Sequence, residues 1–129
     1  AGLYVQSMQA GRTSMLRHHA VNLAGDVADR IRANPAAGAA YVATQGTDND
    51  CVGQNTDCTA AQMAANDIFL WQEQALEFLP PMADGTQQVI VAFDATAVPP
   101  TYTITVRWDE PTPDNIPPSY TITMPVNPF

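Results

Sequence analysis

The 129-residue sequence contains no lysine and only five arginines, against thirteen acidic residues, which gives a formal net charge of −8. Proteins that bind nucleic acid neutralise its phosphates with clustered lysine and arginine, so this composition predicts that nucleic acid is not a partner. The charge is also uneven. Residues 1–34 contain four arginines and two aspartates, whereas residues 35–129 contain one arginine and eleven acidic residues. A weakly basic segment therefore precedes a strongly acidic one.

Motifs for catalysis and cofactor binding are also missing. The sequence has no Gly-x-Ser-x-Gly elbow, no phosphate-binding glycine loop and no His-Glu-x-x-His pattern. The adjacent His18 and His19 would point about 100° apart on a helix, so they cannot both face one metal ion. A segment starting at Asp48 resembles a calcium loop, but Val52 and Thr59 occupy two of its ligand positions. We predict that the chain is not an enzyme and needs no metal or cofactor.

Cysteine is scarce, since Cys51 and Cys58 are the only two in the chain. An even pair at this short spacing in a polar segment predicts a disulfide and an oxidising compartment, and two free thiols in a cytosolic protein are the alternative. The sequence also lacks a secretory signal and any apolar run of about twenty residues, the length that spans a bilayer. If the chain is a fragment, that absence says nothing about the natural protein.

What the sequence does contain is a long amphipathic helix at its start. Apolar side chains recur at three- and four-residue steps between residues 3 and 32. Asn34-Pro35 ends the helix, because a residue that precedes proline disfavours the helical conformation. No capping residue opens it, so we interpret the helix as the second half of a longer one. The side chains of its expected packing and assembly face are Leu16, Leu23, Val27 and Ile31.

A loop and a second helix are predicted next. Residues 36–40 are small and featureless, and the polar run that follows contains both cysteines, so we expect a loop here that the disulfide keeps ordered. Thr59 and Gln62 have the spacing of a capping box, which indicates the start of a helix that ends at Pro80-Pro81. The expected core residues of this second helix are Ile68, Trp71 and Phe78.

Beyond Gly85 the hydrophobic period changes from 3.6 to 2, which predicts three antiparallel strands within residues 86–129. The expected sheet core consists of Tyr102, Ile104, Val106, Trp108, Tyr120 and Ile122. Strands that follow helices, instead of alternating with them, indicate an α+β fold. We expect one domain over residues 1–129, with the long helix at 1–34 and the disulfide loop and second helix at 35–85.

The run Ala-Val-Asn-Leu-Ala-Gly-Asp-Val-Ala-Asp-Arg-Ile-Arg-Ala-Asn-Pro at residues 20–35 resembles a segment of the PilV-type minor pilins of bacterial type IV pili. The run Val-Arg-Trp-Asp-Glu at residues 106–110 matches the Val-x-Trp-x-Glu pattern of these proteins, and a cysteine pair followed by a helix with Asp67 and Trp71 is similar to theirs. Their basic leader and apolar half-helix are missing. A fragment that lacks roughly 25–35 residues explains this, and a natural cytosolic protein with a frayed first helix is the alternative.

The resemblance implies a type IV pilin-like fold, in which the long helix packs on the sheet, and a function in filament assembly. The missing half-helix would hold the subunit in the inner membrane, facing the periplasm, before it enters the extracellular pilus of a Gram-negative bacterium. Leu3 and Met8 would continue the packing face of the helix.

The partners that the resemblance implies are other minor pilins, the major pilin and a tip adhesin. The implied role is to prime pilus assembly near the filament tip. Two alternatives stay open. One is a pseudopilin of a type II secretion system, which shares the fold, and the other is a periplasmic or secreted acidic binding module with a cleaved secretory signal and a short first helix.

Overall fold

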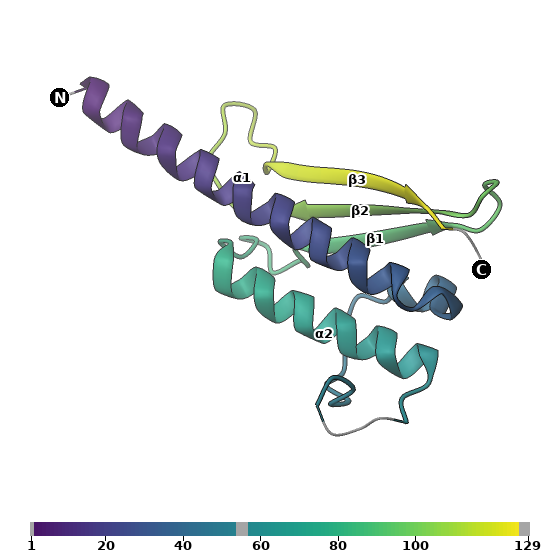
Figure 1. Ribbon diagram of the computed structural model, residues 1–129. Coiled ribbons are helices and arrows are strands. Elements are labelled where there is room, and N and C mark those ends of the chain that lie inside the picture. Colours follow the sequence, from purple (N-terminus) through teal and green to yellow (C-terminus); the bar gives the residue numbers. More distant parts are fainter. Residues whose placement is uncertain (1, 54–56, 127–129) are drawn as a thin grey trace.

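The computed structural model describes residues 2–53 and 57–126, except for the side chains of residues 2–10. Its elements in chain order are α1 (Gly2–Arg32), the 3₁₀ segment η1 (Pro35–Val42), α2 (Ala60–Phe78), β1 (Val89–Asp94), β2 (Thr101–Arg107) and β3 (Ser119–Pro125). The helices α1 and α2 lie side by side on one face of the antiparallel sheet, and the N-terminal end of α1 projects beyond it (Figure 1). We call the described residues from Pro35 to Val126 the head. The arrangement is that of an α+β fold.

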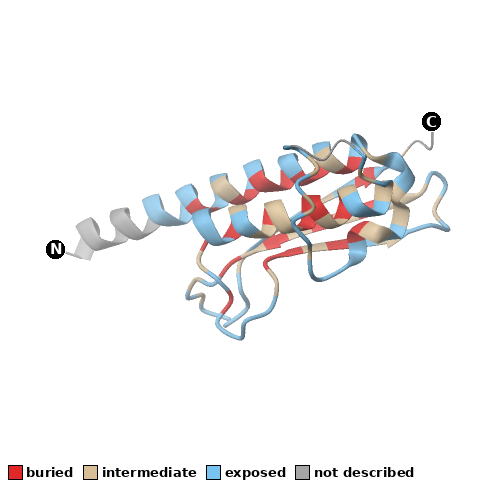
Figure 2. Cartoon of the chain, turned by 90° about the horizontal axis from the view of Figure 1, so that it is seen from below, coloured by how far each residue is buried: buried red, intermediate tan, exposed pale blue. Residues whose placement is uncertain are grey.

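The helix α1 has one buried face and one exposed face. The apolar positions predicted for its packing face lie against the head, and Leu16, the most exposed of them, has an exposed fraction of only 5%. Figure 2 shows these buried residues as a stripe along the side of α1 that faces the sheet. Each aliphatic side chain buried in this way stabilises the fold by about 1.5–3 kcal/mol. The side chains of Leu3 and Met8 lie outside the described residues.

The predicted capping box starts α2. The hydroxyl of Thr59 accepts a hydrogen bond from the backbone N–H of Gln62 at 3.1 Å, and the Gln62 side chain accepts one from the backbone N–H of Thr59 at 2.9 Å. Ile68 and Trp71 are each 1% exposed. Phe78, expected in the same core, is instead 43% exposed. The reason is that the helix ends at this residue, so that the core position passes to Leu79, which is extended and 3% exposed.

The strand β2 is the centre of the sheet, whose order is β1-β2-β3. Every second side chain of β2 is directed toward the helices. These side chains, Tyr102, Ile104 and Val106, are at most 1% exposed, and that of Trp108, just after the strand, is 0% exposed. Tyr120 and Ile122, which were expected in the same core, are half-buried and pack against it. They lie on β3, which is an edge strand and has a neighbour on one side only.

A proline marks the outer edge of β3. The backbone N–H groups of Trp108 and Val126 donate to the carbonyl oxygens of Pro118 and Pro100 across the β2–β3 pair. Because bonded pairs alternate along an antiparallel ladder, Pro125 falls at a position whose nitrogen points away from β2. Its missing N–H therefore removes no hydrogen bond from the sheet, and proline is tolerated on an edge strand for this reason.

The segment η1 corrects the prediction of a featureless loop at residues 36–40. It consists of two short 3₁₀ turns that meet at Gly38, whose φ of 54° lies in the left-handed region. Tyr41 at its end is 1% exposed, and its ring lies 5.6 Å from that of Trp71 and 6.4 Å from that of Tyr102. A run of alanine and glycine has no hydrophobic period, so the pattern gave no sign of this buried tyrosine.

Candidate functional site

A buried carboxylate joins α1, η1 and α2 at one point. Asp67, whose side chain is 4% exposed, accepts a hydrogen bond of 2.6 Å from the Tyr41 hydroxyl on one oxygen. Its other oxygen pairs with the Arg30 guanidinium at 3.2 Å. Burial and the neighbouring Asp67 raise the pKa of Tyr41, so its hydroxyl stays protonated and able to donate at neutral pH. The network fixes the C-terminal part of α1 to the head.

Arg30 does not pair along its own helix. Asp26, four residues earlier, has the spacing for such a pair. In the structure Asp26 instead accepts a hydrogen bond of 3.0 Å from the side chain of Gln74 on α2. Asp29 and Arg32, three residues apart on the helix surface, do pair at 3.4 Å, and both side chains are mostly exposed. The tertiary contact prevails for Arg30 because it neutralises a buried charge, which a surface pair does not do.

A second polar contact fixes α1 at the other end of the head. Glu110 accepts a hydrogen bond of 2.6 Å from the Thr13 hydroxyl on one oxygen and one of 3.0 Å from the indole N–H of Trp108 on the other. Arg17 lies over the Trp108 ring, 5.6 Å from its centroid. The hydrogen bonds from Thr13 and Trp108, with the charges of Arg12 and Arg17, hold the pKa of Glu110 below its ordinary value. Thr13 thus marks the point at which α1 leaves the head.

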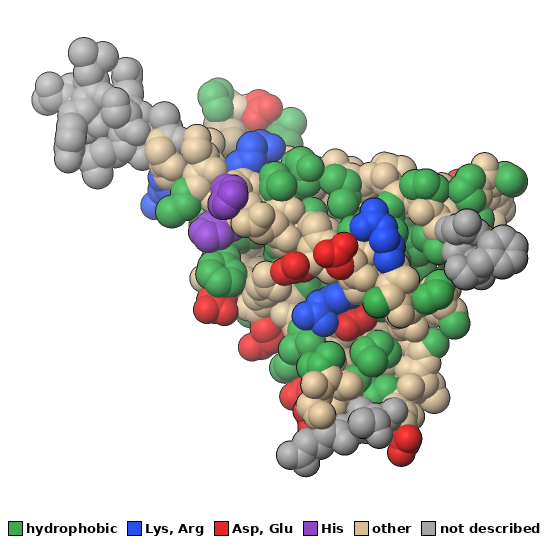
Figure 3. Space-filling view, viewed as in Figure 1, with side chains coloured by type: hydrophobic (Ala, Val, Ile, Leu, Met, Phe, Trp, Pro, Cys, Tyr) green, Lys and Arg blue, Asp and Glu red, His purple; other side chains and the backbone are tan. Residues whose placement is uncertain are grey.

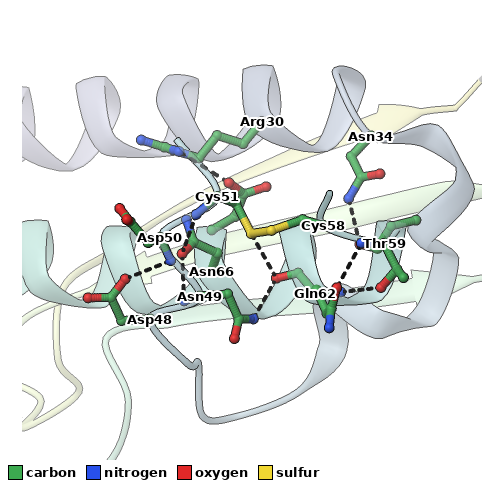
Figure 4. Close-up of a disulfide and its surroundings, with 12 residues drawn as sticks. Arg30, Asn34, Asp48, Asn49, Asp50, Cys51, Cys58, Thr59, Gln62 and Asn66 are labelled. Atoms are coloured by element: carbon green, nitrogen blue, oxygen red, sulfur yellow. Dashed lines mark hydrogen bonds and ion pairs between the residues drawn. A yellow bond between two sulfur atoms is a disulfide. The ribbon is translucent and has the colours of Figure 1, made fainter. Parts of the chain in front are cut away.

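The disulfide predicted between Cys51 and Cys58 is present, with its Cα atoms 5.9 Å apart. The chain before it runs along the surface of α2 (Figure 4). The backbone N–H of Asn49 donates to the side-chain oxygen of Asn66 at 2.9 Å, and the Asn49 amide donates to the carbonyl oxygen of Gln62 at 3.0 Å. The disulfide and these hydrogen bonds therefore hold the segment that leads into Cys51 against the helix.

Gly46 explains how closely this segment approaches α2. A Cβ atom added at this position would meet the backbone nitrogen of Phe69 and lie 2.7 Å from the carbonyl oxygen of Ala65. That same carbonyl accepts a hydrogen bond of 3.0 Å from the backbone N–H of Thr47. Further along, the side chain of Gln72 donates to the carbonyl oxygen of Thr44 at 2.8 Å. The segment lies directly on the helix backbone, which only glycine permits at this point.

The candidate metal ligands have local roles. The Asp48 carboxylate accepts a hydrogen bond from the backbone N–H of Asp50 at 3.1 Å. One ring nitrogen of His18 lies 3.2 Å from the side-chain nitrogen of Asn22, and the ring of His19 stacks on Phe78 with centroids 5.1 Å apart. In the described part of the chain, no three histidine, cysteine, aspartate or glutamate side chains gather where they could hold a metal ion.

The face of α1 that was predicted for both packing and assembly is used for packing within the subunit. Leu16, Leu23, Val27 and Ile31 are at most 5% exposed, because the subunit's own sheet and α2 cover them. The opposite face of α1 is open to solvent and includes Ser14, His18, Val21, Gly25 and Asp29. Figure 3 shows that acidic and basic side chains mix on the surface that α1 and α2 form together. An assembly contact of this part of α1 must therefore use the exposed face.

Sequence reasoning identified the disulfide, Asp67 and Glu110, the last two only through a family pattern. It missed Tyr41 and Thr13 as their partners, because the contacts join residues 26 and 97 positions apart. One signal in the sequence relates to the contact between Trp108 and Glu110. The two residues are two positions apart, which places both side chains on one side of an extended chain. No pattern within either segment indicates the partner of the other.

No helix within residues 2–53 and 57–126 combines the length and the hydropathy needed to cross a bilayer. Comparison with curated proteins found no match, and comparison with solved structures found none either. The model of one protein family, described as type IV pilin Tt1218, matches residues 2–69, which is more than half of the chain. The matched segment contains α1, η1, the disulfide and the first half of α2. The chain belongs to the Tt1218-like family of type IV pilins.

Proposed function

We propose that this pilin is a minor subunit of the type IV pilus, of the PilV type, which primes assembly and takes part in the complex at the filament tip. Membership of the family supports the coarser statement, a structural subunit that interacts with other pilins in a filament and is not an enzyme. The finer assignment is supported by the helix phrase at residues 20–35 and the Val-x-Trp-x-Glu run at 106–110.

The observation that carries the proposal is the way in which α1 leaves the head. From Leu16 onward one face of the helix is buried under the sheet, whereas Gly11 to Met15 are exposed although the helix continues through them. Thr13, held by Glu110, is the described side chain nearest the N-terminus with a hydrogen bond to the head. A helix that extends past its own domain and is anchored at both ends of it suits a subunit that contacts its neighbours through that helix.

In this proposal the inner membrane holds the subunit before assembly, through an apolar helical segment continuous with α1, and the head faces the periplasm. The subunit then enters the extracellular pilus together with other minor pilins and the major pilin. The disulfide loop and the loop at residues 109–118 are surfaces of the head on which a tip adhesin would dock. We propose the single-domain organisation over residues 1–129 as well, since α1 and the head share one hydrophobic core.

Deletion of the gene in its own bacterium tests the proposal. We expect few or no surface pili by electron microscopy while the major pilin stays in the membrane fraction, and recovery of the pili on complementation. A normal number of pili would contradict a role in priming assembly. Normal pili with a loss of protein secretion would instead support the pseudopilin alternative. Complementation with a Glu110→Gln variant tests the anchor of α1, and Glu77→Gln at an exposed site is its control. Loss of pili with the first variant only, at equal levels of both proteins, would come from the lost anchor and not from lowered expression.

A further inference from the structure

We propose that the bond between Asp84 and Gly85 is a site of spontaneous covalent modification in the folded chain, where aspartate converts to isoaspartate through a cyclic imide. The reaction requires that the side-chain carboxyl carbon of an aspartate meet the backbone nitrogen of the next residue. Asp84 is the only aspartate or asparagine in the sequence that precedes a glycine. The modification is independent of the proposed function, since it involves only these two residues and water.

The chemistry at this bond is a cyclisation followed by a hydrolysis. The backbone nitrogen of Gly85 attacks the side-chain carboxyl carbon of Asp84, so that a C–N bond forms while the carboxyl hydroxyl and the amide proton leave as one water molecule. One water molecule then adds to either carbonyl of the imide and reopens the ring. Opening at one carbonyl restores aspartate. Opening at the other leaves isoaspartate, in which the main chain continues through the former side-chain carbon.

The turn that contains Asp84 and Gly85 is open enough for this ring to form. Residues 83–86 are exposed and lie between the end of α2 and the start of β1 (Figure 1). Gly85 has a φ of 75°, and a Cβ atom added there would meet nothing within 4 Å. Its backbone N–H donates to the carbonyl oxygen of Met82 at 3.0 Å. A short exposed turn opens at little cost in free energy, because few buried contacts are lost.

Asp94 provides a comparison within the same chain. Its carboxylate accepts hydrogen bonds from the backbone N–H and the hydroxyl of Thr96 at 3.0 and 2.7 Å. The Asp84 carboxylate accepts the same two bonds from Thr86, at 3.0 and 2.6 Å, and both aspartates are exposed. The two turns differ in the residue that follows the aspartate, which is alanine after Asp94 and glycine after Asp84. Because a side chain on that residue crowds the carboxyl carbon as the ring closes, we expect the reaction at Asp84 and not at Asp94.

Thr86 restrains the reaction in the folded chain. Cyclisation expels the carboxyl hydroxyl, so the neutral carboxyl group is the reactive form. The hydrogen bonds from the hydroxyl and the backbone N–H of Thr86, with the charge of Arg107, lower the pKa of Asp84 and keep its carboxylate ionised. Removal of the Thr86 hydroxyl should therefore raise the rate of modification.

Isoaspartate at this position would change how β1 begins. The Thr86 hydroxyl, which donates to Asp84, also accepts a hydrogen bond of 2.8 Å from the guanidinium of Arg107. Nε of Arg107 donates to the carbonyl oxygen of Gln87 at 2.9 Å, so the last residue of β2 holds the segment that leads into β1. Isoaspartate adds a carbon to the backbone and displaces the carboxylate. Thr86 then loses its acceptor, and the link between this segment and β2 is loosened.

Ageing of the folded 129-residue chain tests the proposal. The chain is kept for weeks at mildly acidic pH and digested, and peptides with aspartate and isoaspartate are separated by chromatography and distinguished by electron-transfer fragmentation. We expect isoaspartate to accumulate at Asp84 and not at Asp94. The chain unfolded in guanidinium chloride is the positive control for the chemistry. A folded chain without isoaspartate at Asp84, or with equal amounts at both residues, would overturn the proposal.

Three variants separate the parts of the mechanism. Gly85→Ala should lower the rate at Asp84 severalfold, because the added methyl group hinders ring closure. Thr86→Val should raise it severalfold, because it removes the hydroxyl that keeps the carboxylate ionised. Thr96→Val is the matched control, which removes the same bond from Asp94, where the following alanine should still prevent the reaction. Equal rates in Thr86→Val and the wild type would contradict the restraint, and reaction at Asp94 in Thr96→Val would contradict the requirement for glycine.

Discussion

Tyr41 donates a hydrogen bond of 2.6 Å to Asp67, and this contact joins η1 to α2 across 26 positions of sequence. The same carboxylate pairs with Arg30 of α1 at 3.2 Å. A buried carboxylate needs such donors, because an unpaired charge in the interior is strongly destabilising. The two contacts therefore fix the C-terminal end of α1 on the head. They also fix the direction in which the helix projects from it.

Replacing Tyr41 by phenylalanine should lower the free energy of unfolding by about 1–3 kcal/mol, because it removes a donor from a buried carboxylate while keeping the ring. Urea denaturation followed by tryptophan fluorescence measures the change. Tyr120→Phe is the control, since Tyr120 is half-buried and has no side-chain hydrogen bond among those described. If both variants lose the same stability, the hydrogen bond to Asp67 does not carry the effect.

The helices show which parts of the fold could be predicted from the sequence. Pro35 and the capping box of Thr59 and Gln62 act over three or four residues, and the structure has both helix ends where these signals placed them. Tyr41 could not be predicted as a core residue, because its position depends on Trp71 and Asp67. Local signals specify local structure, whereas the packing of η1 is determined by segments that the chain reaches later.

Replacing both Cys51 and Cys58 by serine should lower the free energy of unfolding by about 2–3 kcal/mol, as the chain-entropy model gives for a loop of this length. Chemical denaturation of both proteins, with and without reductant, measures it. Reductant should destabilise the wild-type chain and leave the double variant unchanged. Labelling of the unfolded, unreduced wild-type chain should find no free thiol. Two labelled thiols would contradict the disulfide.

Two glycines should respond in opposite directions to alanine. Gly46→Ala should destabilise the fold by about 1–3 kcal/mol, because the added methyl group meets the backbone of α2. Gly25→Ala should stabilise it by up to about 1 kcal/mol, since nothing lies within 4 Å and alanine favours the helix. Thermal unfolding of both variants measures this pair. A loss of stability in Gly25→Ala would contradict the open space that the structure has at this position of α1.

The contacts of Glu110 should make stability depend on pH in the acid range. Its pKa is lowered in the folded state from an ordinary value of 4.5, so its contribution is complete above that value and is lost as the pH falls through the lowered pKa. The difference in unfolding free energy between the wild type and Glu110→Gln should be constant near neutral pH and shrink below about pH 4.5. Glu77→Gln, exposed on α2, is the control. A difference that stays constant down to pH 3 would contradict the anchoring role of this carboxylate.

The candidate site was less predictable than the fold. The packing face of α1 followed from the helical period, but the period alone could not say whether the subunit's own sheet or a neighbouring subunit covers it. The structure shows that the sheet covers Leu23 and Val27, which leaves the face with Val21 and Gly25 for other contacts. The position of Phe78 was wrong because α2 ends at this residue, so that the extended Leu79 takes the core position instead.

The most direct test of the account is to locate the subunit on intact pili. Immunogold electron microscopy with an antibody raised against the head measures this, and a deletion strain provides the negative control. We predict label at the tips of pili and none along their shafts. Label at regular intervals along the whole filament would show a major subunit, and pili without any label would show that the chain is not part of the filament.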